Sequence, residues 1–416
     1  MRLHIPPAFY HRKFRLLWLG LAISIAGTQM QTWALFWHIR TLTDQAIFLG
    51  GIGLARIIPI LFFSLIGGAV ADTVNRRVVL FITQSLMALS ALMLAGLTLV
   101  GTISLWHIYA LTALQALAVS FDLPARQSLV PNLVPPRDLP NAFSLQSISM
   151  QIGSIVGPAL SGFVIAYWGQ AYTYLINAIT YLAVILALLL MGPIAHQRGA
   201  NVRVGVNLTA MRDGLRFIRN QPIILSTMVM DFFATFFSSA NTLMPIFARD
   251  VLHVGAVEYG WLSAAQSIGA IVVGLILSQM EEIRRQGVVF LSAVVIYGLA
   301  TIGFGLARVF ALAMLALMLI GAADAVSTII RNTIRQLQTP DHLRGRMVSV
   351  NQMFFMGGPQ LGEIEAGVVA QLFGAPLAVM SGGVGCLLTV LWIARRFPQL
   401  LVYNGDEPIK VQVAAK

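Results

Sequence analysis

The chain has 416 residues, of which 57% are hydrophobic and only 10% are charged, and its mean hydropathy is +0.80. A soluble globular domain carries about 25% charged residues, so this composition excludes a water-soluble fold and indicates a membrane protein. The net charge of +11 does not indicate nucleic-acid binding, because the basic residues lie singly or in pairs between apolar runs. Cys386 is the only cysteine, which excludes an intramolecular disulfide and a cysteine metal site.

Apolar runs of about twenty residues follow one another along the chain, and each can cross a hydrocarbon core roughly 30 Å thick as a helix. The first run follows Arg12, Lys13 and Arg15 as in a signal peptide, but it continues to Trp37 and is too long for a cleaved segment. The sequence therefore predicts an all-α membrane protein with twelve transmembrane helices, at 15–38, 45–70, 78–100, 105–125, 141–167, 171–192, 222–247, 257–279, 287–307, 309–331, 347–373 and 376–394.

The basic residues separate between alternate loops of this arrangement. All but four of the 27 Lys and Arg residues fall in the terminal segments or in every second loop. The exceptions are Arg40, Arg249 and Arg308 in the opposite loops, and Arg56 within a span. Because Lys and Arg gather in cytoplasmic loops, both termini are predicted to be cytoplasmic.

Features of the first half of the chain recur in the second half in the same order. The sequence therefore predicts two pseudo-symmetric six-helix halves, 1–192 and 221–396, with the substrate path between them. We expect a cytoplasmic linker with an amphipathic helix at 193–220, and a cytoplasmic tail at 397–416. The recurring features are Asp122 and Asp324, Arg126 and Arg331, Gly157-Pro158 and Gly358-Pro359, and Arg76-Arg77 and Arg284-Arg285.

The polar stretch 67–77 is predicted to be a tight hairpin between the second and third spans. Gly68, Asp72, Arg76 and Arg77 follow the pattern G-x-x-x-D-x-x-x-R-[RK], which resembles the loop signature of the major facilitator superfamily. Asn75 stands where that family usually has glycine. The alternative is an ordinary positive turn that only sets the topology.

The resemblance implies that this loop gates the cytoplasmic side during alternating access. We expect Asp72 to meet the first turn of the eleventh helix near Met347, where free N–H groups favour an anion. The further predicted gate pairs are Arg76 with Asp122 at the end of the fourth span and, by duplication, Arg284 or Arg285 with Asp324.

The fifth span carries Gly153, Gly157, Pro158 and Gly162, which resemble the antiporter signature G-x-x-x-G-P-x-x-G-G of the same superfamily, with Ser161 in place of one glycine. That signature is associated with exporters. The alternative is a packing face of small residues four apart, which lets a neighbouring helix approach closely.

The fourth span departs from the drug exporters of the superfamily, which commonly carry R-x-x-Q-G there. This chain has Leu114-Gln115-Ala116 with no arginine before it, so the proton-linked role of that arginine cannot be transferred. Stretches 121–126, 130–135 and 339–346, with Ser24, Gly27 and Thr28 in the first span, resemble the branch that includes macrolide-efflux proteins and the enterobactin exporter.

A charge inside a span costs roughly 2.5–3.5 kcal/mol on insertion scales and therefore needs a reason, and four charged residues are candidates for a function. Arg56 and Asp231 are predicted near the midplane, and Glu363 and Glu365 a little toward the outside. One interpretation is a structural ion pair between Arg56 and a glutamate of the eleventh span. Since the two glutamates are two residues apart, at most one is expected to face the cavity.

Asp231 is the predicted proton-coupling residue, and Glu363 is the second candidate. A coupling carboxylate has to gain and lose a proton, and permanent pairing with a cation would prevent this. Asp231 has no basic residue within two helical turns of its own span, whereas Arg56 can neutralise Glu363 or Glu365. The alternative is that Asp231 only caps or hydrogen-bonds a neighbouring helix.

These features predict a secondary transporter that exports a small amphipathic compound, such as a drug or a siderophore, from a prokaryotic cell across its inner membrane. Protons entering the cell are expected to drive it, because no Walker-type phosphate loop is present. We expect no enzyme activity, no cofactor or metal, no nucleic-acid partner, contact with membrane lipid, and a monomer. The alternatives are lysophospholipid flipping or import, and a ligand sensor that does not transport.

Overall fold

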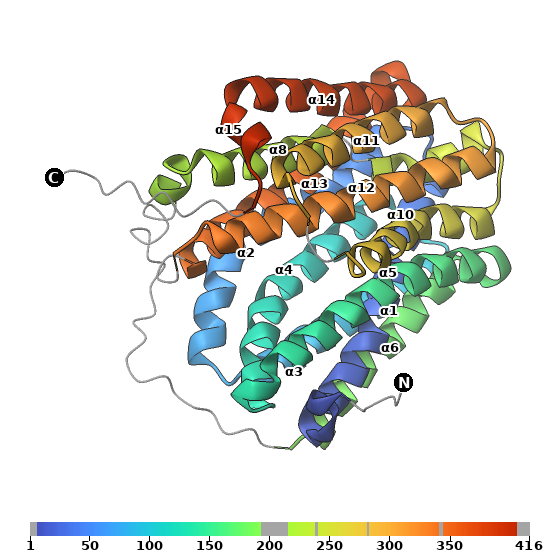
Figure 1. The fold of residues 1–416 in the computed structure, drawn as a ribbon. Helices are drawn as coiled ribbons and strands as arrows, with labels where there is room; N and C mark the ends of the chain where they lie inside the picture. The colour runs from blue at the N-terminus through green and yellow to red at the C-terminus, as the bar shows by residue number, and fades with distance from the viewer. Residues whose placement is uncertain (1–5, 193–214, 238–239, 281–282, 341–343, 406–416) are drawn as a thin grey trace. The chain divides into compact units, whose positions relative to one another are not determined.

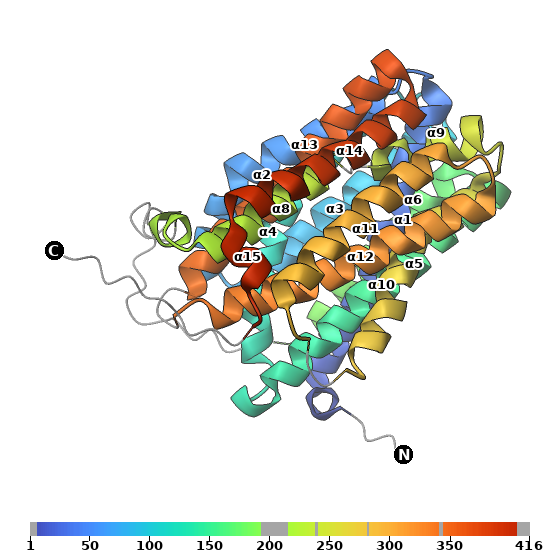
Figure 2. The same cartoon turned by 45° about the horizontal axis from the view of Figure 1, so that its top comes forward.

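The computed structural model describes residues 6–192, 215–237, 240–280, 283–340 and 344–405, and its long elements are helices (Figures 1 and 2). No strand occurs among these residues. Ten of the described helices are long and apolar enough to cross a membrane, judged by length and composition. Two more, α1 (Arg12–Leu42) and α13 (Arg344–Phe373), have 31 and 30 residues but are more polar.

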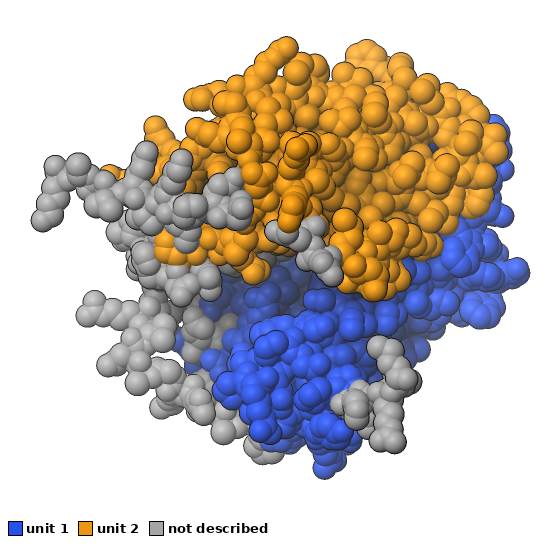
Figure 3. Space-filling model, viewed as in Figure 1, with its two compact units in different colours: residues 1–206, 244–264 blue, residues 207–243, 265–416 orange. Residues whose placement is uncertain are grey.

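The chain forms two compact units, which Figure 3 draws in blue and orange. The first unit comprises Met1–Val206 and Met244–Ala264, and the second comprises Asn207–Leu243 and Ala265–Lys416. Within the first unit, α1 packs against α5 and α6, α3 packs against α4 and α6, and α2 packs against α4. Its other helices are α2 (Ile47–Thr73), α3 (Arg76–Leu99), α4 (Leu105–Leu129), α5 (Leu139–Trp168) and α6 (Gln170–Leu190), with short 3₁₀ turns at Pro7–Tyr10, Val130–Asn132 and Pro136–Asp138.

The second unit repeats this packing. α8 contacts α13 and α14 as α1 contacts α5 and α6, and α11 contacts α12 and α14 as α3 contacts α4 and α6. In Figures 1 and 2, α11 lies between α12 and α14. The repetition found in the sequence is thus also a repetition of helix packing. The bounds are α8 (Pro222–Phe237), α11 (Gln286–Leu306), α12 (Phe310–Leu337), α14 (Ala375–Arg396) and α15 (Pro398–Val402). The helix α10 (Ala256–Leu277) begins in the first unit and continues in the second from Ala265.

The seventh predicted span, 222–247, is not one continuous α-helix. After α8 the chain forms the 3₁₀ turn η4 (Ala240–Leu243), the short helix α9 (Met244–Ile246) and the π-helix η5 (Phe247–Val251). Pro245 lacks a backbone N–H, so the hydrogen-bond ladder of an α-helix cannot run through it. The hydropathy of the span gives no sign of this break.

The boundary between the two units falls in the same stretch, between Leu243 and Met244. Residues 244–264 belong to the first unit, where the Tyr259 hydroxyl donates a hydrogen bond to the backbone oxygen of Trp33 at 2.8 Å. The sequence prediction assigned residues 244–264 to the second six-helix half, 221–396, so the structure differs from the prediction here. The predicted division at 193–220, of which 193–214 lie outside the described residues, stays a prediction.

Candidate functional site

The stretch 67–77, predicted as a hairpin, is mostly helical: 67–73 form the end of α2, and only Val74 and Asn75 separate it from α3. Its two glycines, both in α2, have different surroundings. A Cβ on Gly67 would lie 2.1 Å from the backbone oxygen of Ser120, so α2 and α4 approach closely because Gly67 has no side chain. No described atom lies within 4 Å of the corresponding position on Gly68. Asn75, the departure from the family pattern, caps α3 by accepting a hydrogen bond from the Arg77 backbone N–H at 3.0 Å.

Asp122 is buried near the end of α4 and has three partners. It forms an ion pair with Arg126, one turn further along the same helix. It also accepts hydrogen bonds from Thr83 Oγ1 at 3.1 Å and from Gln84 Nε2 at 2.8 Å, both on α3. The structure therefore gives Asp122 the partner Arg126 in place of the predicted Arg76, because residues four apart on a helix share one face.

Arg77 uses its Nε to donate a hydrogen bond to the backbone oxygen of Leu188 on α6, at 2.8 Å. The side chain of Asp72 lies outside the described residues, although Met347, its predicted neighbour in α13, is buried. The contact predicted for Asp72 stays a prediction.

Asp231 on α8 forms an ion pair with Arg331 on α12, and the two side chains are only 3% and 5% exposed. The expectation that no cation neutralises Asp231 is wrong, because Arg331 comes from a different helix, a hundred residues further along the chain. Arg331 Nη2 also lies 3.9 Å from the half-exposed carboxylate of Asp324. The structure thus gives Asp324 the neighbour Arg331 where the duplication predicts Arg284 or Arg285.

These three charged residues line a small pocket between α8, α11 and α12 in the second unit. The same pocket is lined by polar side chains that can hydrogen-bond a ligand or water, namely Thr235, Tyr297 and Ser327. One Arg and two Asp side chains leave the pocket with one excess negative charge when all three are ionised. The arrangement can therefore accept one proton without losing the partner of Arg331.

A second buried arginine continues this polar cluster along α12. Arg335 Nε donates to the backbone oxygen of Arg331 at 3.1 Å, and its two terminal nitrogens donate to the side-chain oxygens of Asn332 and Asn351. The hydrogen-bond partners of the Arg335 guanidinium are therefore amide oxygens, whereas the carboxylates of Asp231 and Asp324 lie beside Arg331.

The other candidate intramembrane charges, Arg56, Glu363 and Glu365, are not among the residues that line this pocket. The Arg56 guanidinium lies 5.6 Å from the centre of the Phe36 ring, in cation–π range. Glu363 and Glu365 are half-buried on α13. Since Arg56 and the two glutamates belong to different units, their predicted pairing stays a prediction.

The predicted antiporter signature lies on packing faces of α5. Added Cβ atoms on Gly153 and Gly157 would lie 2.6 Å from Ile25 Cγ2 and Gln29 Cβ of α1 respectively, and one on Gly162 would lie 2.4 Å from the backbone oxygen of Ala256. Pro158, between them, is buried. The glycines thus let α1 and the first turn of α10 approach α5, as the packing alternative predicts.

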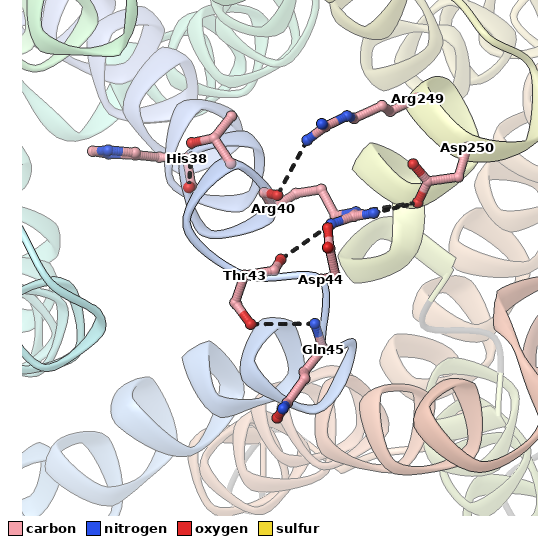
Figure 4. A network of polar contacts seen from close by, with 8 residues as sticks. His38, Arg40, Thr43, Asp44, Gln45, Arg249 and Asp250 are labelled. Carbon is pink, nitrogen blue, oxygen red and sulfur yellow. Dashed lines mark hydrogen bonds and ion pairs between the residues drawn. The ribbon is translucent and has the colours of Figure 1, made fainter.

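Sequence analysis did not find the polar network that Figure 4 shows at the end of α1. Arg40 donates to Asp250 Oδ2 through Nη2 at 2.8 Å and through Nε at 3.1 Å, and it also pairs with Asp44. The hydrogen bond from Arg40 lowers the pKa of the exposed Asp44 carboxyl. Arg249 adds a long hydrogen bond to the backbone oxygen of Arg40. Arg40 and Arg249 are two of the three basic residues that the sequence analysis left in the loops opposite the basic ones, and this exception could have indicated the network.

Two six-helix sets with the same packing, spans of membrane length and a charged pocket inside one set define a multi-pass membrane transporter. The chain belongs to the transmembrane secretion effector family, because the sequence model of that family matches residues 6–404. This family has the major facilitator fold, so the predicted superfamily and fold class are confirmed.

Two relatives match most of the chain. The multidrug efflux pump Tap of Mycolicibacterium fortuitum is 29% identical and aligns with 82% of this chain and 84% of its own length. The enterobactin exporter EntS of Citrobacter koseri is 25% identical and aligns with 94% of this chain and 90% of its own.

Solved structures show the same fold at low identity. An inward-facing bacterial homologue of the human lysosomal transporter Spinster has a TM-score of 0.72 and 14% identity, with 96% of this chain and 97% of its own covered. A bacterial homologue of the iron transporter ferroportin has a TM-score of 0.69 and 16% identity, with 94% and 99% covered.

Proposed function

We propose that this protein exports a small amphipathic compound across a prokaryotic inner membrane in exchange for protons, with both termini in the cytoplasm. The observation that carries the proposal is the Asp231–Arg331–Asp324 cluster, which lines a pocket in the second unit. Family membership and the relatives Tap and EntS support export of small molecules.

The proton-binding group in this proposal is Asp231. A buried guanidinium needs a nearby anion, because an unpaired charge is costly in a medium of low dielectric constant. When Asp231 takes up a proton, Arg331 loses that partner and turns to Asp324, which lies 3.9 Å away. Deprotonation of Asp231 reverses the exchange. One proton is thereby converted into a movement of the Arg331 side chain.

Coupling follows if the exported molecule competes with the proton at this pocket. A compound that contacts Asp324 or Arg331 favours one of the two pairings and therefore one protonation state of Asp231. Glu363 remains the second candidate for the proton, and Arg56 and Glu365 are proposed to balance charge around it. The cytoplasmic gate is proposed at Gly68, Asp72, Arg76, Arg77, Asp122, Arg285 and Asp324.

Transport into inside-out vesicles tests this function. Ethidium uptake driven by an imposed proton gradient is expected with the wild-type protein, and an uncoupler should abolish it. ATP added with the uncoupler should not restore uptake. Accumulation that resists the uncoupler and depends on ATP would rule out proton-driven exchange.

Two matched variants test the role of Asp231. Asp231→Asn is expected to bind ethidium but to lose the dependence of uptake on pH. Asp122→Asn removes a buried aspartate of the other unit that also pairs with an arginine, and it should slow uptake without changing its pH dependence. If Asp231→Asn kept the wild-type pH profile, the proton would be carried by another residue.

A further inference from the structure

The first unit contains a chain of hydrogen-bonded amides that crosses three helices. Asn177 Nδ2 on α6 donates to Gln31 Oε1 on α1 at 2.7 Å, and Gln31 Nε2 donates to Gln115 Oε1 on α4 at 2.8 Å. The Thr180 hydroxyl donates to Asn177 Oδ1 at 2.9 Å and begins the chain. Gln31 and Asn177 are 2% and 0% exposed, so water does not compete for these bonds.

Asn177 and Gln31 each accept a hydrogen bond from one side and donate one to the other. The last carbonyl oxygen, Gln115 Oε1, is occupied by Gln31, so the Gln115 amide must present its N–H groups beyond the chain. Gln115 Nε2 is buried and has no hydrogen-bond partner among the described residues. The chain therefore ends in an unused donor.

Thr112 lies three residues before Gln115 on α4, and the two residues share one face of the helix. Its Oγ1 is also buried without a partner among the described residues, although a threonine in a helix commonly bonds the carbonyl oxygen one turn earlier. A buried donor without a partner costs free energy comparable to a lost hydrogen bond. Two such groups, one turn apart, indicate a partner from outside the chain.

We propose that Gln115 and Thr112 form a subsite that binds an uncharged hydrogen-bond acceptor of the exported molecule, such as an amide or ester carbonyl oxygen. This inference rests on the proposed export function and names a chemical class for its substrate. The network consists of amides and hydroxyls, so an anion bound there would lack a counter-charge, and its desolvation would be costly. A neutral carbonyl oxygen satisfies both donors without that penalty.

Calorimetric titration of the purified protein, without a proton gradient, tests the subsite separately from coupling. Chloramphenicol is an uncharged probe with an amide carbonyl, and tetraphenylphosphonium is a lipophilic cation without an acceptor. Gln115→Leu is expected to bind chloramphenicol about tenfold more weakly, as for the loss of one buried hydrogen bond. Its affinity for tetraphenylphosphonium should stay within about twofold of wild type.

Gln115→Glu provides a second variant that keeps the size and the acceptor toward Gln31 but removes the amide donor, and it should behave like Gln115→Leu. Gln29→Leu is the matched control, because Gln29 is a half-buried glutamine of α1 outside the network; this variant should bind both probes as wild type does.

Unchanged chloramphenicol affinity in both Gln115 variants would mean that only water fills the subsite, and would overturn the proposal. An equal loss for both probes would also overturn it, as a general structural effect. Failure of proton-driven ethidium uptake, with the binding contrast intact, would count against the transport mechanism alone.

Discussion

The ion pair between Asp231 and Arg331 leads to a prediction about stability. The two side chains are 3% and 5% exposed, so removing one partner leaves the other charge in a largely dry environment. Breaking a buried pair in this way costs about 3–5 kcal/mol. We expect the lower end, because Arg331 also bonds the Thr328 hydroxyl at 2.8 Å and lies 3.9 Å from Asp324.

A double-mutant cycle measures this coupling. Asp231→Asn and Arg331→Gln should each reduce the free energy of unfolding by about 3 kcal/mol. The double variant replaces the ion pair with two neutral amides of similar size, and it should lose less than the sum of the single losses by at least about 2 kcal/mol. The measurement is chemical unfolding in detergent micelles, followed by tryptophan fluorescence.

The pair Asp122 and Arg126 is the control for this cycle. Its arginine is 22% exposed and its partner is one turn away on the same helix, so the same cycle should give a smaller coupling energy. Additive losses at Asp231 and Arg331, within about 0.5 kcal/mol, would refute the pairing, because residues that do not interact behave additively.

Three further outcomes are expected. Gly67→Ala should lower the unfolding temperature and Gly68→Ala should leave it unchanged, since only the first Cβ would meet the backbone of α4; equal melting curves would contradict this packing. Asp250→Asn should cost about 1 kcal/mol in chemical unfolding, as for a partly exposed ion pair, and a loss above about 3 kcal/mol would indicate a buried one. The pKa of Asp44 is lowered below its ordinary value of 3.8 by the hydrogen bond from Arg40, so its stabilising contact is present above pH 3.8 and is lost only on acidification below it. Asp44→Asn should therefore leave the pH profile of uptake between about pH 5 and 8 unchanged, and a shifted profile would contradict that assignment.

Much of the fold could be predicted from the sequence, because the membrane requires long apolar helices and sorts basic residues between its two sides. The predicted span 78–100 corresponds to α3, and 45–70 corresponds to α2. The seventh span was predicted as continuous because its composition stays apolar. Its interruption depends on Pro245 and on packing of the following residues in the first unit, which hydropathy does not record.

The candidate site was predicted only in part. Asp231 was identified because a charge inside a membrane span is energetically unfavourable. Its partner Arg331 was assigned to the cytoplasmic side, since it lies near the predicted end of the tenth span. Pairing between distant helices depends on helix rotation and crossing, which charge counting does not supply. The amide chain at Gln31, Gln115 and Asn177 was missed for the same reason. None of these residues is charged, and Gln115 was noted only as the glutamine of the incomplete R-x-x-Q-G pattern.

The two repeated halves use equivalent aspartates in different ways, and this difference supports the assignment of coupling to the second unit. On α4, Asp122 is buried and held by Arg126 and by two donors from α3, so each carboxylate oxygen has a fixed partner. On α12, Asp324 is half-exposed and only 3.9 Å from an arginine that is already paired with Asp231. An exchange of partners requires one cation and two competing acceptors. Only the second arrangement provides them among the described residues, so we infer that duplication left a pair without a competing acceptor in one half and a pair that can exchange partners in the other.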